Sequence, residues 1–301
     1  MVKNKKLNKV LRKFSYNKDL MDFIKILYPE LLDYFKDEEI ILDSLLSVRI
    51  ILCERVDEYI GKDEYLSILA SPEDVGDIDG IFFSSPNLQY DTLTKEFLIS
   101  GVSRYILVKG DIKSDATKKA LIHEICHLIK TGTNEFVIKH DTYVQRCGFT
   151  KITNQILLDE DKYSLETVFE DGKYLEEGFN ELAAEEIGAK LEIKEGIDTE
   201  YLIPHQIANV IMNFNIPNIR EKVIYAQLHH DYKDIENELG EGFFLFQDLA
   251  DFAYVQTAMI SQVDITKEER NKLYEDMLSY FENNHQEIIK KIREYRKSRE
   301  R

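Results

Sequence analysis

The sequence predicts an α+β fold, in which helices and a small sheet occupy separate stretches of the chain. Apolar residues recur at helical spacing in residues 18–60 and again beyond Gly196. Between these stretches, residues 78–90 and 96–110 are rich in Ile, Phe, Val and Tyr and are bounded by Gly, Pro and Asn, which is typical of strands. The regular strand–helix alternation of a parallel sheet is missing, so the pattern favours α+β over α/β.

We divide the chain into three regions on this pattern. Residues 1–70 are predicted to be an N-terminal helical region, with two or three helices between 18 and 60. Residues 71–196 hold the strands and the motif described below, after a turn-rich break at 71–80. Within them, residues 134–174 are mixed, with strand-like runs at 142–149 and 167–175 and a hairpin turn indicated by EDGK at 170–173. Residues 197–301 are predicted to be mostly helical, with helices at 204–214, 219–230, 243–260 and 267–301.

Composition narrows the possible partners and compartments. The chain has 56 acidic residues against 39 Lys and Arg, a formal net charge of −17, and this field repels the phosphates of nucleic acids. Its three cysteines, Cys53, Cys126 and Cys147, show no disulfide framework and no CxxC pair. No apolar run has the length of a membrane span, and no signal peptide is recognisable. We therefore expect a cytoplasmic protein that binds neither membranes nor nucleic acid.

A metal-binding motif lies in the predicted helix at 110–132. Ser114 or Asp115 can cap the start of this helix, and Gly132 can mark its end. His123 and His127 are four residues apart, so on a helix their imidazoles project from one face toward one point. Glu124 is rotated by about 100° from His123, which places its carboxylate beside a bound metal rather than on it. H-E-x-x-H on a helix is typical of zinc sites in which the glutamate is the general base. The alternative is a structural helix with two histidines that bind no metal.

A catalytic zinc site needs a third protein ligand and an open position. The best candidates lie in residues 174–188, where Glu177, Glu181 and Glu185 recur every four residues on one helical face. Small residues interleave with them, which would let this helix pack closely against another. A solvated acidic face is the alternative interpretation.

These two segments resemble the gluzincin metallopeptidases, which include thermolysin and the zinc aminopeptidases. The resemblance covers residues 115–190 and implies a zincin-like core: a small mixed sheet, a motif helix, and a second helix that carries a glutamate ligand. The E-G-x-x-E run at 177–181 is also similar to that of uncharacterised bacterial HExxH proteins. The spacing departs from the better-known families, because 49 residues separate His127 from Glu177.

The resemblance allows two assignments of the third ligand. In the first, Glu177 binds zinc and Glu181 orients a histidine ligand from outside the coordination shell. In the second, Glu181 binds zinc and Glu185 supports it. We favour the first, and Glu181 belongs to the site in both.

The prediction is therefore a zinc-dependent, metallopeptidase-like hydrolase. One Zn²⁺ would be held by His123, His127 and Glu177, with Glu124 as general base and a peptide or protein as substrate. By resemblance, the strand at 104–110 would pair with an extended peptide. The alternative is a metal-binding regulatory or interaction protein without general peptidase activity. Weaker candidates for an oxyanion-stabilising group are Tyr143, Arg146, Tyr201, His205, and the His229, His230 and Asp231 run.

Overall fold

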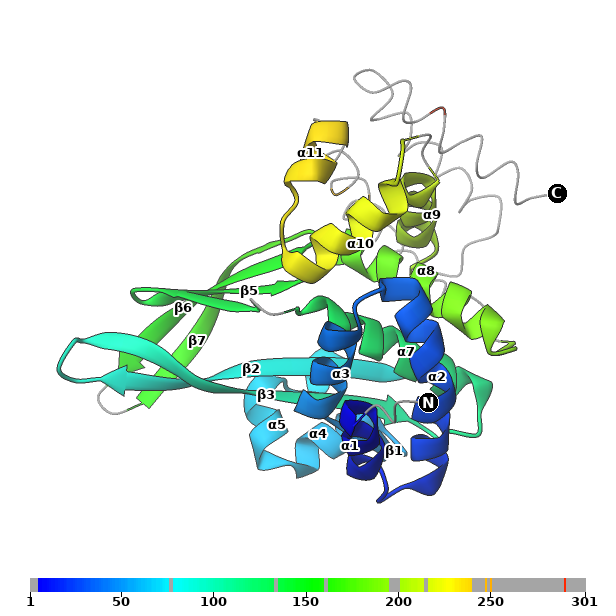
Figure 1. The fold of residues 1–301 in the computed structure, drawn as a ribbon. Helices are drawn as coiled ribbons and strands as arrows, with labels where there is room; N and C mark the ends of the chain where they lie inside the picture. The colour runs from blue at the N-terminus through cyan, green and yellow to red at the C-terminus, as the bar shows by residue number, and fades with distance from the viewer. Residues whose placement is uncertain are drawn as a thin grey trace, which may run out of the picture.

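The computed structural model describes residues 5–75, 78–132, 135–159, 162–194, 201–213 and 216–239, together with residues 247, 250 and 290. Within them the fold is mixed α+β, as predicted. Figure 1 shows helices gathered at one end, while a long hairpin and a second sheet extend away from them to one side.

Three helices and a short strand form the N-terminal part. They are α1 (Lys5–Lys13), α2 (Lys18–Phe35), α3 (Glu38–Ser47) and β1 (Val48–Cys53). Asn17 and Asp37 cap α2 and α3, each accepting a hydrogen bond from a backbone amide three residues on. The helices predicted between 18 and 60 are present, but the run VRIILC within that stretch is the strand β1, which was not predicted. Short helices follow: α4 (Val56–Lys62), α5 (Glu64–Leu69) and α6 (Pro72–Val75).

The first sheet is small and mixed, as expected. Its order is β1-β3-β2, with β1 parallel to β3 (Glu96–Lys109) and β2 (Gly80–Asp91) antiparallel to it. The predicted strands at 78–90 and 96–110 are thus confirmed. By resemblance, residues 104–110 were expected to be the edge strand that pairs with a peptide. That prediction is wrong, because β3 is paired with β1 along Arg104–Lys109 and with β2 as far as Val108. The edge strands of this sheet are β1 and β2.

The motif helix α7 (Asp115–Lys130) follows β3 and packs on β2 and β3. Ser114 is its N-cap residue, and Gly132 has a φ of +59° just beyond its end, a conformation that favours glycine. The second predicted helix is α8 (Lys173–Lys190), and it packs against α7. Figure 1 shows α7 between the first sheet and α8.

A second, antiparallel sheet joins α7 to α8. Its strands are β4 (Phe136–Lys139), β5 (Thr142–Cys147), β6 (Thr150–Asp159) and β7 (Lys162–Asp171), in that spatial order. The strand predicted at 142–149 contains all of β5, and the one predicted at 167–175 overlaps only the end of β7, while β4 and β6 were not predicted. The EDGK segment, predicted to be a hairpin turn, is instead the junction of β7 with α8. Gly172 is the N-cap residue of α8, with a φ of +71°.

Beyond α8 the chain is helical where the structure describes it. The elements are α9 (Leu202–Met212), α10 (Ile219–His229) and α11 (Lys233–Leu239), which match two of the predicted helices and add one. The helices predicted at 243–260 and 267–301 lie almost entirely outside the described residues. One apolar core contains residues of α2, α3, α7, α8, α9 and α10. Among the described residues, no helix is both long and apolar enough to cross a membrane.

Candidate metal site

His123 and His127 on α7 meet Glu177 on α8. Glu177 Oε2 lies 3.0 Å from His123 Nε2 and 3.1 Å from His127 Nε2. One ligand atom from each of the three residues falls within 4.8 Å of the others, so the group could hold a metal ion. Zinc bonds of 2.0–2.1 Å at tetrahedral angles would set neighbouring ligand atoms about 3.3–3.4 Å apart. The two histidine–glutamate distances are therefore within a few tenths of an ångström of those in a coordinating arrangement.

Local sequence explains why the two helices bring these groups together. The four-residue spacing puts both imidazoles on the α7 face that meets α8, with ring centroids 5.1 Å apart. On α8, Ala183 and Ala184 are fully buried. At Gly178 a Cβ would overlap the backbone carbonyl of Pro204 in α9. The predicted close approach of a helix to the small residues is thus seen, and at Gly178 the helix that approaches is α9.

Glu181 lies on the other nitrogen of His123. Its Oε2 is 3.2 Å from His123 Nδ1, while its Oε1 accepts a hydrogen bond from Lys119. Only 3% of the Glu181 side chain is exposed. His123 is thus bracketed by two carboxylates, with Glu177 at Nε2 and Glu181 at Nδ1. Glu185, one turn further along α8, lies 2.7 Å from Nε2 of His205 on α9.

His127 has a different neighbour on α8. The side-chain amide nitrogen of Asn180 is 2.8 Å from His127 Nδ1, and its carbonyl oxygen accepts a 2.8 Å hydrogen bond from Lys130. Lys130 also pairs with Glu176 at 2.9 Å, and both side chains are fully buried. Glu176 accepts further hydrogen bonds from the Phe149 backbone amide and the Gln227 side chain. Sequence reasoning missed this network, because lysines and glutamates at such positions usually face solvent.

Glu124 is buried between α7 and the edge strand β2. Its residue exposure is 8%, and a Cβ at Gly80 would lie 3.1 Å from its Cγ. Burial raises the pKa of Glu124, although the neighbouring histidines and a hydrogen bond from the Phe82 backbone oppose the shift. A glutamate with a raised pKa is suited to take up a proton near neutral pH.

The pKa values of His123, Glu177 and Glu181 are shifted in favour of their charged forms. Burial opposes a charge on His123, but its hydrogen bonds with Glu177 and Glu181 outweigh burial and raise its pKa to about 10. Burial alone would raise the pKa of Glu181, yet the hydrogen bond with His123 and the nearby Lys119 lower it to about 2. The same balance lowers the pKa of Glu177, whose largest favourable interaction is with His127.

The weaker sequence candidates are spread over the molecule. Tyr201 stacks on His123, with ring centroids 5.8 Å apart, and is thus beside the site. Tyr143 belongs to a separate apolar cluster where the hairpin meets the second sheet. Nε2 of His230 lies 3.1 Å from the Lys130 carbonyl oxygen. The remaining candidates contact other residues. The Arg146 backbone amide donates to the Glu135 carbonyl oxygen, and the His229 ring packs against Tyr225. The Asp231 carboxylate accepts a hydrogen bond from the Lys233 amide.

Cys147 lies nearer to the site than its position in the sequence indicated. Its Sγ is 3.7 Å from His127 Nδ1 and donates to the His127 carbonyl oxygen at 3.2 Å. Burial raises the pKa of the Cys147 thiol, which disfavours the thiolate that a nucleophile requires. Cys126, inside the motif, is fully buried in the main core as expected.

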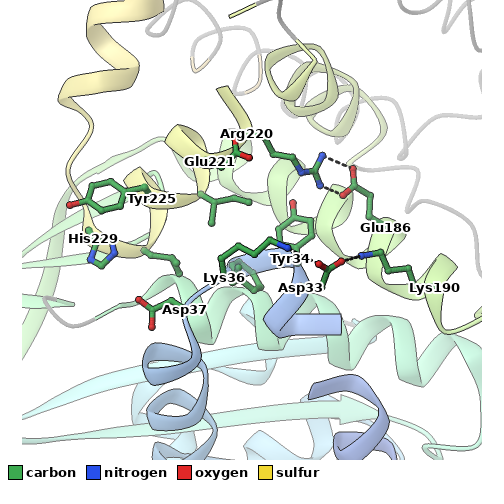
Figure 2. A pocket seen from close by; sticks show the side chains of 13 residues that line it. Asp33, Tyr34, Lys36, Asp37, Glu186, Lys190, Arg220, Glu221, Tyr225 and His229 are labelled. Carbon is green, nitrogen blue, oxygen red and sulfur yellow. Dashed lines mark hydrogen bonds and ion pairs between the residues drawn. The ribbon is translucent and has the colours of Figure 1, made fainter. Parts of the chain in front are cut away.

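A cavity of about 510 Å³ lies among α2, α8 and α10, and none of the three metal-binding candidates lines it. Figure 2 shows its charged side chains paired with one another: Arg220 with Glu186, and Lys190 with Asp33. The Arg220 guanidinium also lies 5.2 Å from the ring centroid of Tyr34. These pairs tie α10 to α8 and α8 to α2.

Comparison of the chain with models of protein families, with curated proteins and with solved structures finds no match. The class of site therefore rests on geometry alone. It is a His-His-Glu group on two packed helices, with a buried glutamate beside it.

Proposed function

We propose that this protein is a zinc-dependent, metallopeptidase-like hydrolase with a gluzincin-type core. The observation that carries the proposal is the convergence of Glu177 on Nε2 of both motif histidines, from a helix 50 residues further along the chain. Two imidazoles and one carboxylate are a common ligand set for catalytic zinc. The combination of a small mixed sheet, motif helix and glutamate helix supports the zincin-like assignment.

The geometry favours Glu177 over Glu181 as the third ligand. Glu177 faces the same nitrogen, Nε2, of both histidines, whereas Glu181 faces Nδ1 of His123 only. A histidine that binds metal through one nitrogen usually donates its other N–H to an outer carboxylate, which fixes the ring. Glu181 is in that position.

The exposure of the group supports a catalytic rather than a purely structural metal. The His127 and Glu177 side chains are 15% and 14% exposed, so two of the three candidate ligands are not fully closed off from solvent. When bound, zinc lowers the pKa of a water molecule toward about 7 and polarises a carbonyl group. Glu124 is the group that would accept the proton of the attacking water and return it to the leaving amine.

Substrate pairing is assigned to β2 rather than β3, because β3 is paired on both sides. Glu124 receives a hydrogen bond from the Phe82 backbone on β2 and packs against Gly80 of the same strand. A peptide that added to the outer edge of β2 would therefore pass beside the general base. Main-chain pairing of this kind recognises extended peptides with limited dependence on their side chains.

The test measures both the zinc content of the protein and its turnover of peptide substrates. Protein prepared without chelators is expected to hold one zinc per chain and to cleave members of a fluorogenic peptide library. Glu124→Gln should keep the zinc and lose at least about 100-fold in turnover, in line with the loss of a general base. His123→Ala should lose both zinc and turnover. His140→Asn, at an exposed position with a positive φ, should keep both. Zinc-loaded wild-type protein that cleaves no peptide would favour the regulatory or interaction role.

A further inference from the structure

We propose that Lys119 is a positioning residue that holds Glu181 on His123 and thereby keeps it out of the metal's coordination shell. The inference rests on the proposed metal site and deepens it. It explains how two glutamates on one helical face take different roles.

The two glutamates have similar opportunities to reach a metal. Glu177 and Glu181 are one turn apart on α8, and each places Oε2 within 3.2 Å of a nitrogen of His123. Residues at i and i+4 share a helical face, so their places on α8 do not by themselves decide which carboxylate binds the metal. Some further contact must distinguish them.

Lys119 supplies that contact. Its ammonium group binds Glu181 Oε1, while Oε2 of the same carboxylate faces His123 Nδ1. Lys119 is four residues before His123, so α7 presents both to α8 on one face. The lysine side chain is 12% exposed and that of Glu181 is 3% exposed, and such a shielded ion pair is screened by water far less than a surface pair. Both carboxylate oxygens of Glu181 are therefore engaged away from the Nε2 side of the ring.

A positioning role for Lys119 and a simple charge effect predict opposite changes in metal affinity when the lysine is removed. A lysine that acted only as a nearby positive charge would repel the cation, so its removal would strengthen metal binding. A lysine that holds Glu181 in place would, on removal, free this carboxylate and loosen His123. Loss of an outer partner typically weakens metal binding about 10- to 100-fold.

The experiment measures Zn²⁺ affinity by competition with a chromophoric chelator, and Co²⁺ absorption as a report on coordination. Lys119→Met is expected to bind Zn²⁺ about 10-fold more weakly and to have an altered Co²⁺ spectrum. Lys119→Arg, which keeps the charge and the donors, should restore both. Lys118→Met is the matched control, because Lys118 is the adjacent residue and pairs with Asp115 outside the site.

A double-mutant cycle separates positioning from a general effect on folding. In a Glu181→Gln background, Lys119→Met should cause little further loss of affinity, because the pair is already broken. The inference would be overturned if the two single losses of Zn²⁺ affinity added up in the double variant. It would also be overturned if Lys119→Met bound Zn²⁺ as tightly as the wild type or more tightly. Should Lys119→Met fail to fold, Lys119→Gln is judged by the same criteria. Wild-type protein that takes up neither Zn²⁺ nor Co²⁺ would instead overturn the metal site itself, and the inference with it.

Discussion

Lys130 and Glu176 form an ion pair in which neither side chain has any exposed surface, with 2.9 Å between Nζ and Oε1. The pair connects the end of α7 to the start of α8, the two helices that carry the candidate ligands. Lys130 also donates to Asn180, which contacts His127. The ion pair is thus joined to the metal site through one side chain.

Breaking this pair should strongly destabilise the protein. Lys130→Met leaves Glu176 charged and buried, and removal of one partner of a buried pair typically costs about 3–5 kcal/mol. We expect a loss of this size in the free energy of unfolding, measured by urea denaturation monitored by circular dichroism. Lys118→Met breaks only a partly exposed pair with Asp115 and should change stability by less than about 1 kcal/mol. Similar losses in the two variants would show that the buried pair has no special role.

The assignment of the third ligand gives a second prediction. Glu177→Ala should remove most of the bound zinc, because its carboxylate faces Nε2 of both histidines. Glu181→Ala should weaken zinc affinity by only about 10- to 100-fold, as is typical of a residue that orients a ligand. Isothermal titration with Zn²⁺ measures both. Equal losses, or a larger loss at Glu181, would contradict the assignment.

The pKa of His123 predicts how metal-free stability depends on pH. This pKa is raised from 6.5 to about 10 in the folded protein. Its contribution to stability is therefore complete below pH 6.5 and is lost as the pH rises through 10. Glu181 has the opposite sign: its pKa is lowered from 4.5 to about 2, so its contribution is present above pH 4.5 and is lost as the pH falls through 2. Metal-free protein should thus show a falling Tm from about pH 6.5 upward in thermal denaturation.

Zinc affinity should increase as the pH rises above about 6.5, whereas the stability of the metal-free protein falls. Zinc must displace a proton from His123, so its apparent affinity should increase by about tenfold per pH unit for each proton released. Titrations at pH 6, 7 and 8 in non-coordinating buffers would measure the slope. A flat profile would show that His123 is already neutral before the metal binds.

The sequence predicted the parts of the site that depend on local spacing. The helical positions of His123, Glu124 and His127 follow from their periodicity, and so does the common face of Glu177 and Glu181. The roles of Lys119 and Lys130 could not be predicted in this way. A lysine on a helix is normally solvated, whereas α8 supplies a carboxylate to each of these two, one of which is fully buried and the other largely shielded.

The errors in the fold have similar causes. The run at Val48–Cys53 is apolar and only six residues long, so periodicity does not distinguish a strand from part of a helix. Its partner is β3, some 50 residues later, and this long-range pairing decides the outcome. In EDGK, Gly172 has a positive φ of +71°, but the predicted hairpin turn is wrong, because α8 follows. The segment after Gly172 forms a helix rather than a strand because α8 packs against α7 and α9.

Replacement of either of two glycines of α8 by alanine should change the free energy of unfolding, in opposite directions at the two positions. At Gly178, a Cβ would overlap the backbone carbonyl of Pro204, which cannot move without displacing α9. Gly178→Ala should therefore destabilise the protein by about 1–3 kcal/mol, as is typical of overpacking. At Gly188, a Cβ would lie 3.6 Å from Ile193 Cβ, an ordinary contact. Gly188→Ala should instead stabilise the helix by about 0.5–1 kcal/mol, because alanine loses less backbone entropy than glycine on folding.

Chemical denaturation of the two variants measures both effects, and the metal site adds a further readout. Displacement of α9 should also move Tyr201, which precedes α9 and stacks on His123 with 5.8 Å between the ring centroids. Gly178→Ala should therefore change tyrosine and Co²⁺ absorption on metal binding, whereas Gly188→Ala should leave these spectra as in the wild type. If Gly178→Ala were as stable as the wild type, α9 would not be packed against α8 at this position, and the placement of Tyr201 beside His123 would lose its support.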